Sequence, residues 1–533
     1  MVALEQQLLE TRRQTWQREL DATKSAEERN RLGQFATPYP LAVQIAAYVR
    51  SLLPPAHPPL RFADPSVGSG SFYSAAAEVF GADCFDLATG IELDPAFADA
   101  AENLWGRSGL RLVRGDFTRL ITRDACPPAP NLILANPPYV RHHHLDRDEK
   151  LRLQAIVLQR TGLKTSGLAG LYVYFLLLAT TWMEKGGLAA WLIPSEFMDV
   201  NYGSTLREFL STRVTLRRIH RFDPAAVQFD DALVSSAIVV FENTTPPAAH
   251  HAEFSFGGPL AAPVVNEPVS AARLRASRKW SGFPRHATND RQISRDHDDG
   301  PRLGDFFRIQ RGIATGANDY FILPRAEARR LGLPDACLRA ILPSPRHLPA
   351  TVIEAEADGY PRIEPQLCLI DFDMSEEQIA ARHPALWAYL QTGEAAGVRD
   401  GYLVRSRSPW YKQEQRRPAP FLCTYMGRGT QGKAPFRFIW NRSAATATNL
   451  YLLLTPQNGL AKMLAAHPDR AAWLHAWLNQ VTGDELRGVG RVYGGGLNKI
   501  EPKELARICA KHLLDQWPEI SANHDMQGDL LLQ

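Results

Sequence analysis

The segment Leu132-Ile133-Leu134-Ala135-Asn136-Pro137-Pro138-Tyr139 places the tightest constraint on how this chain folds. Four apolar residues that end abruptly in an amide, two prolines and an aromatic ring predict a buried parallel strand that stops at the edge of a sheet. Proline has no N–H and a fixed φ, so the Pro-Pro step cannot continue a strand ladder and holds the preceding carbonyls in one geometry. Because ligands of open α/β sheets bind outside the carboxyl ends of strands, we expect this turn to carry chemistry.

The groups of this turn suit a planar amine. The side-chain oxygen of Asn136 and the carbonyl of Pro137 can accept both hydrogens of an exocyclic amine while Tyr139 stacks on the ring that carries it. A flipped adenine has such an amine. The same residues are also compatible with a strand and a proline-rich turn that has no chemical role, so other parts of the chain must distinguish the two.

A second strand end is predicted at Asp64-Pro65-Ser66-Val67-Gly68-Ser69-Gly70. Two glycines one residue apart let the backbone turn tightly and approach a ligand, before a helix from about Phe72. An acid at position 64 suits a ligand with an amine and a positive centre better than it suits a pyrophosphate.

Two further predicted strands also end in acids. Glu92 follows the glycine turn by about 24 residues and is suited to accept both hydroxyls of a ribose. Asp116 follows the strand near Leu110–Arg114 and can accept an adenine amine, with Phe117 against the ring. Each acid alone is more often a helix cap than a ligand, but three successive strand ends that each finish in an acid favour a nucleoside site.

The chain begins with a segment, residues 1–32, whose apolar spacing among many charges predicts a helical arm packed on the main domain. Gly33-Gln34-Phe35-Ala36-Thr37-Pro38 follows and leads into an amphipathic stretch from Leu41 to Leu53. Thr37 before Pro38 has the form of a helix entry, a capping side chain followed by proline at the first helical position.

Taken together, these motifs resemble the S-adenosylmethionine-dependent amino-methyltransferases of DNA, in which a glycine turn, a ribose acid, an adenine acid and Asn-Pro-Pro-Tyr occur in this order. The Gly33–Pro38 motif is similar to the first motif of the gamma class of N6-adenine methyltransferases, which are TaqI-like in layout. The resemblance covers residues 30–245 with specific motifs and the C-terminal half more loosely. It implies an α/β fold with a doubly wound mixed sheet, class I and Rossmann-like, and a second α+β target-recognition domain.

The resemblance also implies roles for individual residues. The cofactor would be S-adenosylmethionine, held by Thr37, Pro38, Asp64, Pro65, Gly68, Gly70, Glu92, Asp116, Phe117 and Asn136. The catalytic residues would be Asn136, Pro137, Pro138, Tyr139 and Phe229. Phe229 resembles the family aromatic that packs against the extruded base opposite Tyr139, although a core phenylalanine would fit its position as well.

Charge is spread unevenly along the chain. Residues 1–250 have a net charge of −2 and the remainder has +5. Residues 401–450 hold nine basic side chains and one acid, interleaved with Trp410, Tyr411, Tyr425, Phe436, Phe438 and Trp440. Such a block suits double-stranded DNA, with a solvated loop face as the alternative. The residues expected to contact DNA are His142, Arg311, Arg405, Arg407, Arg428, Arg491 and Lys499.

The motifs divide the chain into four segments. Residues 1–32 form the arm, 33–245 the methyltransferase domain, 246–300 a linker rich in proline and glycine, and 301–533 the target-recognition domain. We expect a monomer, and a separately encoded restriction endonuclease as partner, because no nuclease motif is legible in the sequence.

Other classes of protein fit the sequence poorly. The six cysteines have no paired spacing, which predicts reduced thiols, and His142-His143-His144 lack the carboxylate or thiolate partners of a metal site. No apolar stretch reaches the ~20 residues of a membrane span, and the N-terminus lacks the apolar region of a signal peptide. We therefore expect a bacterial, cytoplasmic, nucleoid-associated protein without metal or membrane contact.

Two alternative functions stay open at the level of sequence. Asn-Pro-Pro-Tyr also occurs in methyltransferases of a protein glutamine amide or an RNA guanine amine, which present a similar nitrogen. From another class, the chain could be a DNA-binding module with a non-catalytic cofactor site.

Overall fold

The computed structural model describes residues 2–121, 127–223, 235–284, 300–428, 435–481, 486, 491–493 and 497–521. The chain forms two compact units, Met1–Arg295 and Asp296–Gln533. The first unit contains the motif-bearing strands, and each unit has its own hydrophobic core.

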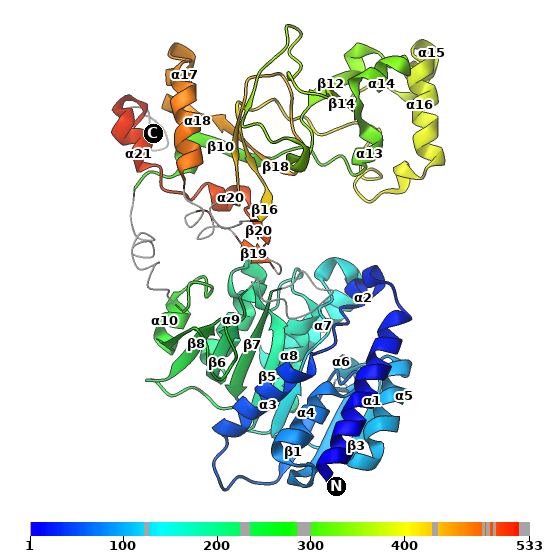
Figure 1. Ribbon diagram of the computed structural model, residues 1–533, viewed down its shortest axis with the longest axis vertical. Coiled ribbons are helices and arrows are strands. Elements are labelled where there is room, and N and C mark those ends of the chain that lie inside the picture. The colour runs from blue at the N-terminus through cyan, green and yellow to red at the C-terminus, as the bar shows by residue number, and fades with distance from the viewer. Residues whose placement is uncertain are drawn as a thin grey trace. The chain divides into compact units, whose positions relative to one another are not determined.

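The first unit is built on a nine-stranded mixed sheet (Figure 1). Its strand order is β3-β2-β1-β4-β5-β7-β6-β8-β9. The bounds are β1 Leu60–Asp64, β2 Phe85–Glu92, β3 Leu110–Arg114, β4 Leu132–Ala135, β5 Leu188–Pro194, β6 Thr215–Arg221, β7 Ser236–Glu242, β8 His251–Phe256 and β9 Val265–Ser270. The first five strands are parallel, and β7 runs antiparallel between β5 and β6.

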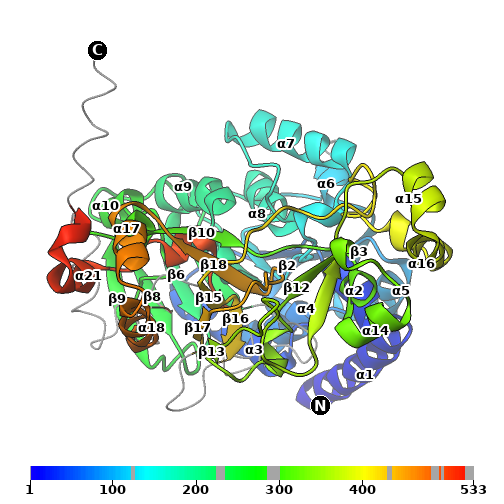
Figure 2. The same ribbon diagram turned by 90° about the horizontal axis from the view of Figure 1, so that it is seen from above.

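Helices cover both faces of this sheet, as the buried central strands require. One side carries α7 Arg147–Thr161, α8 Leu171–Trp182 and α9 Ser204–Thr212, and the other carries α3 Tyr39–Leu52 and α4 Ser71–Phe80, with α5 Pro95–Trp105 beyond (Figure 2). Ile133 and Trp191 face the first side, whereas Leu134 and Ala190 face the second. Near-continuous apolar runs are typical of strands that are buried on both faces. The helices on both faces and the mixed strand order confirm the predicted doubly wound mixed sheet.

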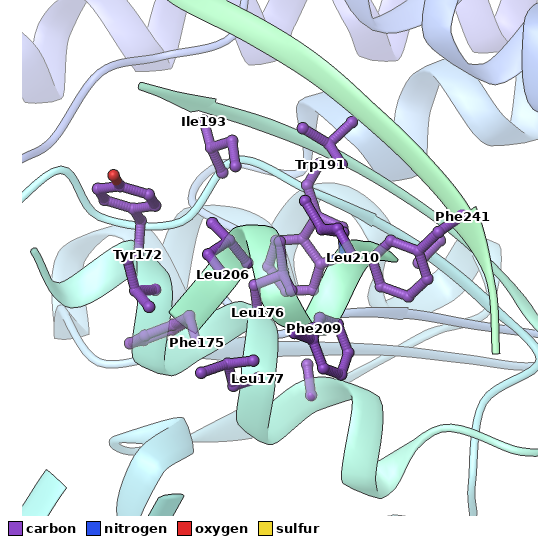
Figure 3. Close-up of a cluster of buried hydrophobic side chains, with 14 of the residues drawn as sticks. Tyr172, Phe175, Leu176, Leu177, Trp191, Ile193, Leu206, Phe209, Leu210 and Phe241 are labelled. Atoms are coloured by element: carbon purple, nitrogen blue, oxygen red, sulfur yellow. The ribbon is translucent and has the colours of Figure 1, made fainter. Parts of the chain in front are cut away.

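The core on the α8 side is filled by large side chains. Leu176 of α8 lies beside Trp191 of β5, and Phe209 of α9 packs edge-on against Phe241 of β7 (Figure 3). These side chains hold β4 and β5 against α8, so the carboxyl ends of the two strands are fixed relative to each other.

The strand order reverses between β1 and β4. The chain proceeds from β1 outward to β2 and β3 and then returns to place β4 on the other side of β1. Crossovers that diverge in this way leave a crevice at the carboxyl ends of the two strands, where ligands bind in open α/β sheets. Asp64 ends β1 and Asn136 follows β4, so both lie at this point.

Two helices precede the sheet, α1 Val2–Ala22 and α2 Ala26–Leu32. The predicted helical arm is therefore helical, and α1 packs on α4 and α5. Short elements complete the unit: α6 Phe117–Leu120, α10 Ala271–Ala276 and the 3₁₀ turn η4 His142–His144.

The prediction that residues 246–300 form a linker is wrong over much of this segment. Its strands β8 and β9 pair with each other, and β8 pairs parallel with β6, so they extend the large sheet. Most proline and glycine of this segment lie outside the two strands, for example Gly257-Gly258 directly after β8, whereas Pro268 lies within the edge strand β9. This composition concealed a hairpin.

The second unit is α+β. Its largest sheet has the order β10-β18-β15-β17-β13, with bounds Phe307–Arg311, Tyr451–Pro456, Phe421–Thr424, Phe438–Asn441 and Val352–Ile353. Two three-stranded sheets accompany it: β11 Ile322–Pro324, β14 Leu367–Ile370 and β12 Leu338–Ile341, and β16 Met426–Arg428, β20 Leu497–Lys499 and β19 Arg491–Tyr493. Its longer helices are α16 Pro384–Ala395, α17 Asn458–Ala466 and α18 Arg470–Gln480.

Two further sequence expectations have structural counterparts. Cys84, Cys337, Cys368, Cys423 and Cys509 are free thiols, and Cys126 lies outside the described residues. Among the described residues, every helix is too short or too polar to cross a membrane.

Replacing Leu176 by alanine tests the core of the first unit. Leu176 is fully buried in α8, so Leu176→Ala should lower the free energy of unfolding by about 3 kcal/mol. Leu151→Ala on α7 is the control, because Leu151 is 55% exposed and its loss should change stability by less than about 0.5 kcal/mol. Urea denaturation measures both, and equal effects would contradict this account of the core.

Candidate active site

The turn after β4 holds the Asn136 carboxamide in one orientation. Asn136 Nδ2 donates to the backbone oxygen of Phe35 at 2.8 Å and to Thr37 Oγ1 at 3.1 Å. Asn136 Oδ1 is buried and finds no hydrogen-bond partner among the described residues. Because both amide hydrogens are used by the protein, the oxygen is the group presented for an outside donor.

The segment before α3 crosses directly over this turn. Tyr139 N donates to the Gly33 oxygen at 3.0 Å, and Gly33 has a positive φ of 67°. A Cβ at position 33 would overlap the Tyr139 backbone nitrogen, so only glycine permits this crossing. Thr37 is therefore not the helix cap that the sequence predicted. Pro38 takes the N-cap position without a side-chain bond, while the Thr37 hydroxyl serves Asn136.

Tyr139 is anchored at both ends of its side chain. Its ring lies 5.6 Å from the Phe35 ring, and its hydroxyl donates to the Leu192 backbone oxygen at 3.0 Å. The side chain is 6% exposed, and burial raises its pKa well above the usual tyrosine value. Pro137 is buried and Pro138 half-buried beside it. The Tyr139 ring is thus fixed to β5 through the hydroxyl group.

Two carboxyl groups lie at the neighbouring strand ends. Asp64 is 2% exposed, and one of its oxygens accepts from Ser66 N at 3.0 Å. Burial, together with the charge of Glu92, raises the pKa of Asp64 to about 8 despite that hydrogen bond. Burial also raises the pKa of Glu92, which accepts from Gly68 N at 2.9 Å and Asp94 N at 2.8 Å. Ser66 Oγ donates to the Asn136 backbone oxygen, which ties this loop to the Asn136 turn.

The two glycines of the turn do different work. Both have positive φ, 55° at Gly68 and 91° at Gly70. A Cβ added at Gly68 would meet nothing within 4 Å, whereas one at Gly70 would overlap the Trp105 indole. Only Gly68 therefore keeps an open approach for a ligand. Gly70 is required by Trp105 packing. That Gly70 also contacts the cofactor stays a prediction.

The third predicted acid is a helix cap. One oxygen of Asp116 accepts from Thr118 N at 2.8 Å at the start of α6, and the other lies 3.3 Å from Arg119 Nε. Phe117 is 1% exposed, and its ring packs against Phe175 and Trp182 in the core. Phe117 thus lies in the protein interior. The contact of Asp116 and Phe117 with an adenine stays a prediction.

The residues at these strand ends fit S-adenosylmethionine by their chemistry. The cofactor has a positive sulfonium, an ammonium and a ribose, and two buried carboxyl groups beside an open glycine offer matching charge and acceptors. Pro65 is buried behind Asp64, whereas Pro38 is exposed.

The predicted DNA-contacting residues of the second unit differ in how far their side chains are engaged by other groups of the protein. Arg407 donates to the Ala314 oxygen and, at 3.1 Å, to Gln413 Oε1, which makes it a structural residue and corrects its assignment. Arg311 lies over the Tyr425 ring at 4.2 Å, and Lys499 is paired with Glu501 at 3.1 Å. Arg405 is exposed.

Six aromatic rings interleaved with the basic block were expected to face a nucleic acid. Five of these six are buried in hydrophobic cores instead, Trp410, Tyr411, Tyr425, Phe436 and Phe438, whereas Trp440 is half-buried. Phe229 and the side chains of Arg428 and Arg491 lie outside the described residues. His142 is half-buried in η4, where burial and the nearby Lys150 charge lower its pKa.

Sequence reasoning missed the groups that hold the site from behind. Ser66, the backbone oxygen of Phe35 and the side chains of α1 that reach Ser69 were not singled out. Backbone acceptors carry no signal in a sequence, and only the clustering of Glu10, Arg13 and Gln17 on one helical face would have suggested a buried polar contact.

Comparison with known proteins gives matches over most of the chain. Residues 131–228 match the Eco57I restriction-modification methylase family, and residues 285–526 match the C-terminal domain of the type II methyltransferase M.Eco57I. The chain is 30% identical over 490 residues to the type II methyltransferase M.XamI of Xanthomonas campestris pv. amaranthicola, covering 90% of this chain and 85% of that protein. It is 24% identical over 516 residues to the type II methyltransferase M.AccI of Acinetobacter calcoaceticus, covering 92% and 87%.

A solved structure shares the fold. The type IIL restriction-modification enzyme MmeI, solved in complex with DNA, superposes with a TM-score of 0.52 at 12% identity and covers 85% of this chain and 66% of that chain.

The buried Asp64 carboxyl should make stability fall as pH rises. Its folded pKa of about 8 lies above the unfolded value of about 3.9, so between these values the folded chain keeps a proton that the unfolded chain loses. The stabilisation is complete below pH 4 and is lost as pH approaches 8, with a slope of about 1.4 kcal/mol per pH unit between the two pKa values. Urea unfolding of the wild type and Asp64→Asn from pH 4.5 to 8.5 tests this. A constant difference between the two would contradict the raised pKa.

Proposed function

The chain belongs to the type II methyltransferases, and on this premise we propose that it transfers the methyl group of S-adenosylmethionine to N6 of a flipped adenine in duplex DNA. The observation that carries the proposal is the buried Asn136 Oδ1, an acceptor without a hydrogen-bond partner in the described parts of the chain. A buried acceptor of this kind costs free energy unless a ligand supplies a donor.

An exocyclic amine supplies that donor. Its lone pair is delocalised into the ring, which makes the nitrogen a poor nucleophile. Hydrogen bonds from the amine to Asn136 Oδ1 and the Pro137 carbonyl would favour a pyramidal nitrogen and stabilise the positive charge that develops on it. The cofactor supplies an electrophilic methyl group. As the new N–C bond forms, the bond from the sulfonium sulfur to the methyl carbon would break and leave neutral S-adenosylhomocysteine. The amine would lose one proton to water, and no strong base is required.

Support for the gamma class comes from the segment before α3. Gly33, Phe35 and Thr37 precede the glycine turn in the sequence and contact the Asn136–Tyr139 turn in space. Asp64, Gly68 and Glu92 would hold the cofactor, and Tyr139 would stack on the adenine. A separately encoded restriction endonuclease remains the expected partner, in keeping with the restriction-modification family that matches residues 131–228.

DNA would be gripped by the second unit. Tyr402 is 78% exposed, and the Arg405 guanidinium lies 5.6 Å from its ring centroid. Val404 between them is fully buried, and the Arg407 hydrogen bonds fix the same loop. An exposed arginine beside an exposed ring, on a rigid support, suits a phosphate contact with base or sugar packing.

Asn136→Ala tests the catalytic proposal. Loss of the amine acceptor should lower transfer of labelled methyl to duplex DNA at least ~100-fold, while affinity for S-adenosylmethionine changes by less than about threefold. Asn103→Ala is the control, because Asn103 is exposed on α5 and is not one of the residues proposed for the site. Full activity of Asn136→Ala would end the proposal.

The product identifies the substrate. Digestion of the methylated DNA to nucleosides, followed by mass spectrometry, should yield N6-methyladenine. N4-methylcytosine would overturn the adenine assignment, and transfer to protein or RNA alone would overturn the DNA assignment.

Arg405→Ala tests the DNA contact. Loss of one phosphate contact should weaken DNA binding about fivefold at low salt and reduce the slope of log affinity against log salt by about 1. Arg399→Ala is a matched control, since Arg399 belongs to the same region but is paired with Glu394 at 2.5 Å. Fluorescence anisotropy over a salt series measures both, and equal slopes for all three proteins would remove Arg405 from the interface.

A further inference from the structure

We propose that helix α1 is a working part of the cofactor site, in which Arg13 and Gln17 are positioning residues that hold the glycine turn in the shape that binds S-adenosylmethionine. This inference rests on the proposed function and adds a role for the N-terminal arm, to which the motifs assign none.

The contact is made on Ser69, the residue between the two glycines with positive φ. Arg13 Nη1 donates to Ser69 Oγ at 3.0 Å, and Ser69 Oγ donates to Gln17 Oε1 at 2.7 Å. From the other direction, Trp105 Nε1 donates to the Ser69 backbone oxygen at 2.9 Å. Since glycine on either side leaves the backbone free to rotate, these three bonds help to fix the turn, together with the bonds from Gly68 N to Glu92 and from Gly70 N to the Val67 oxygen.

A buried ion pair fixes the orientation of the Arg13 guanidinium group. Its Nε and Nη2 donate to the two carboxylate oxygens of Glu10 at 2.8 and 2.7 Å, which leaves Nη1 for Ser69. Arg13 is 3% exposed and Glu10 is 5% exposed. A buried pair of this kind costs desolvation and is poor evidence for added stability. Its bidentate geometry instead provides a directed hydrogen bond.

The arm also reaches the second cofactor loop. Lys24, just beyond α1, donates to Asp94 and, at 2.9 Å, to Gln34 Oε1. Asp94 N in turn donates to Glu92 Oε1 at 2.8 Å, and the other Glu92 oxygen accepts from Gly68 N at 2.9 Å. The arm, the glycine turn and the proposed ribose acid therefore form one connected network. Loosening α1 should disturb cofactor binding while leaving the Asn136 turn intact.

The test compares Arg13→Ala, Ser69→Ala and a control, Arg18→Ala, in the full chain. Arg18 is exposed on α1, and within the described part of the chain its guanidinium donates to Gln14 and Thr15 of the same helix. We expect Arg13→Ala and Ser69→Ala to raise KM and the calorimetric Kd for S-adenosylmethionine about tenfold, with kcat at saturating cofactor and DNA affinity within twofold of the wild type. Arg18→Ala should match the wild type in every measurement.

The controls separate this inference from a general loss of stability. Arg13→Ala leaves Glu10 buried without its partner, so if that variant fails to fold, Ser69→Ala decides, because it keeps the ion pair. Unchanged cofactor affinity in Ser69→Ala, or a fall in kcat and thermal stability without a rise in KM, would overturn the role of α1. A wild-type chain that binds no S-adenosylmethionine would instead refute the proposed function.

Discussion

The orientation of one carboxamide is the constraint on which the proposed chemistry depends. Asparagine can present either its oxygen or its NH₂ group to a ligand, and only the oxygen can accept an amine hydrogen. In this chain the Phe35 backbone oxygen and the Thr37 hydroxyl take the amide hydrogens, which leaves the buried Oδ1 of Asn136 without a partner among the residues that the structure describes. The Gly33–Thr37 segment thus selects the acceptor face, and the glycine at position 33 is what lets it pass close enough.

The sheet supplies the setting for that amide. Because the strand order reverses between β1 and β4, the loops after these strands meet, and the Ser66 hydroxyl bonds the Asn136 backbone oxygen across them. The same arrangement buries Asp64 and partly buries Glu92 near each other. The raised pKa of Asp64 reflects the free-energy cost of placing its charged form there. A cationic ligand would relieve that cost. Acceptor and acids are therefore brought together by topology and held by buried hydrogen bonds.

Sequence reasoning succeeded where a motif coincides with a strand end. The strands ending at Asp64 and Ala135 and the order of motifs led to the mixed sheet and to the type II methyltransferase premise. It failed where one residue type serves two purposes. Proline and glycine at residues 246–300 suggested a linker, but this segment contains a hairpin. Trp410 and Tyr411 suggested a nucleic-acid surface, but both side chains are buried in a core. Composition reports which residues are present, whereas burial depends on partners far along the chain.

By itself, the sequence determined the run of buried strands, the abrupt stop at Asn136-Pro137-Pro138 and the glycine turn, because chain stiffness and apolar periodicity act over a few residues. Only the tertiary structure decided that Thr37 serves an amide rather than a helix end, that Gly70 accommodates Trp105, and that Arg13 reaches Ser69. These pairs are separated by 35 to 99 positions, and hydrogen bonds over such spans form only after the layers have packed. No local pattern encodes them.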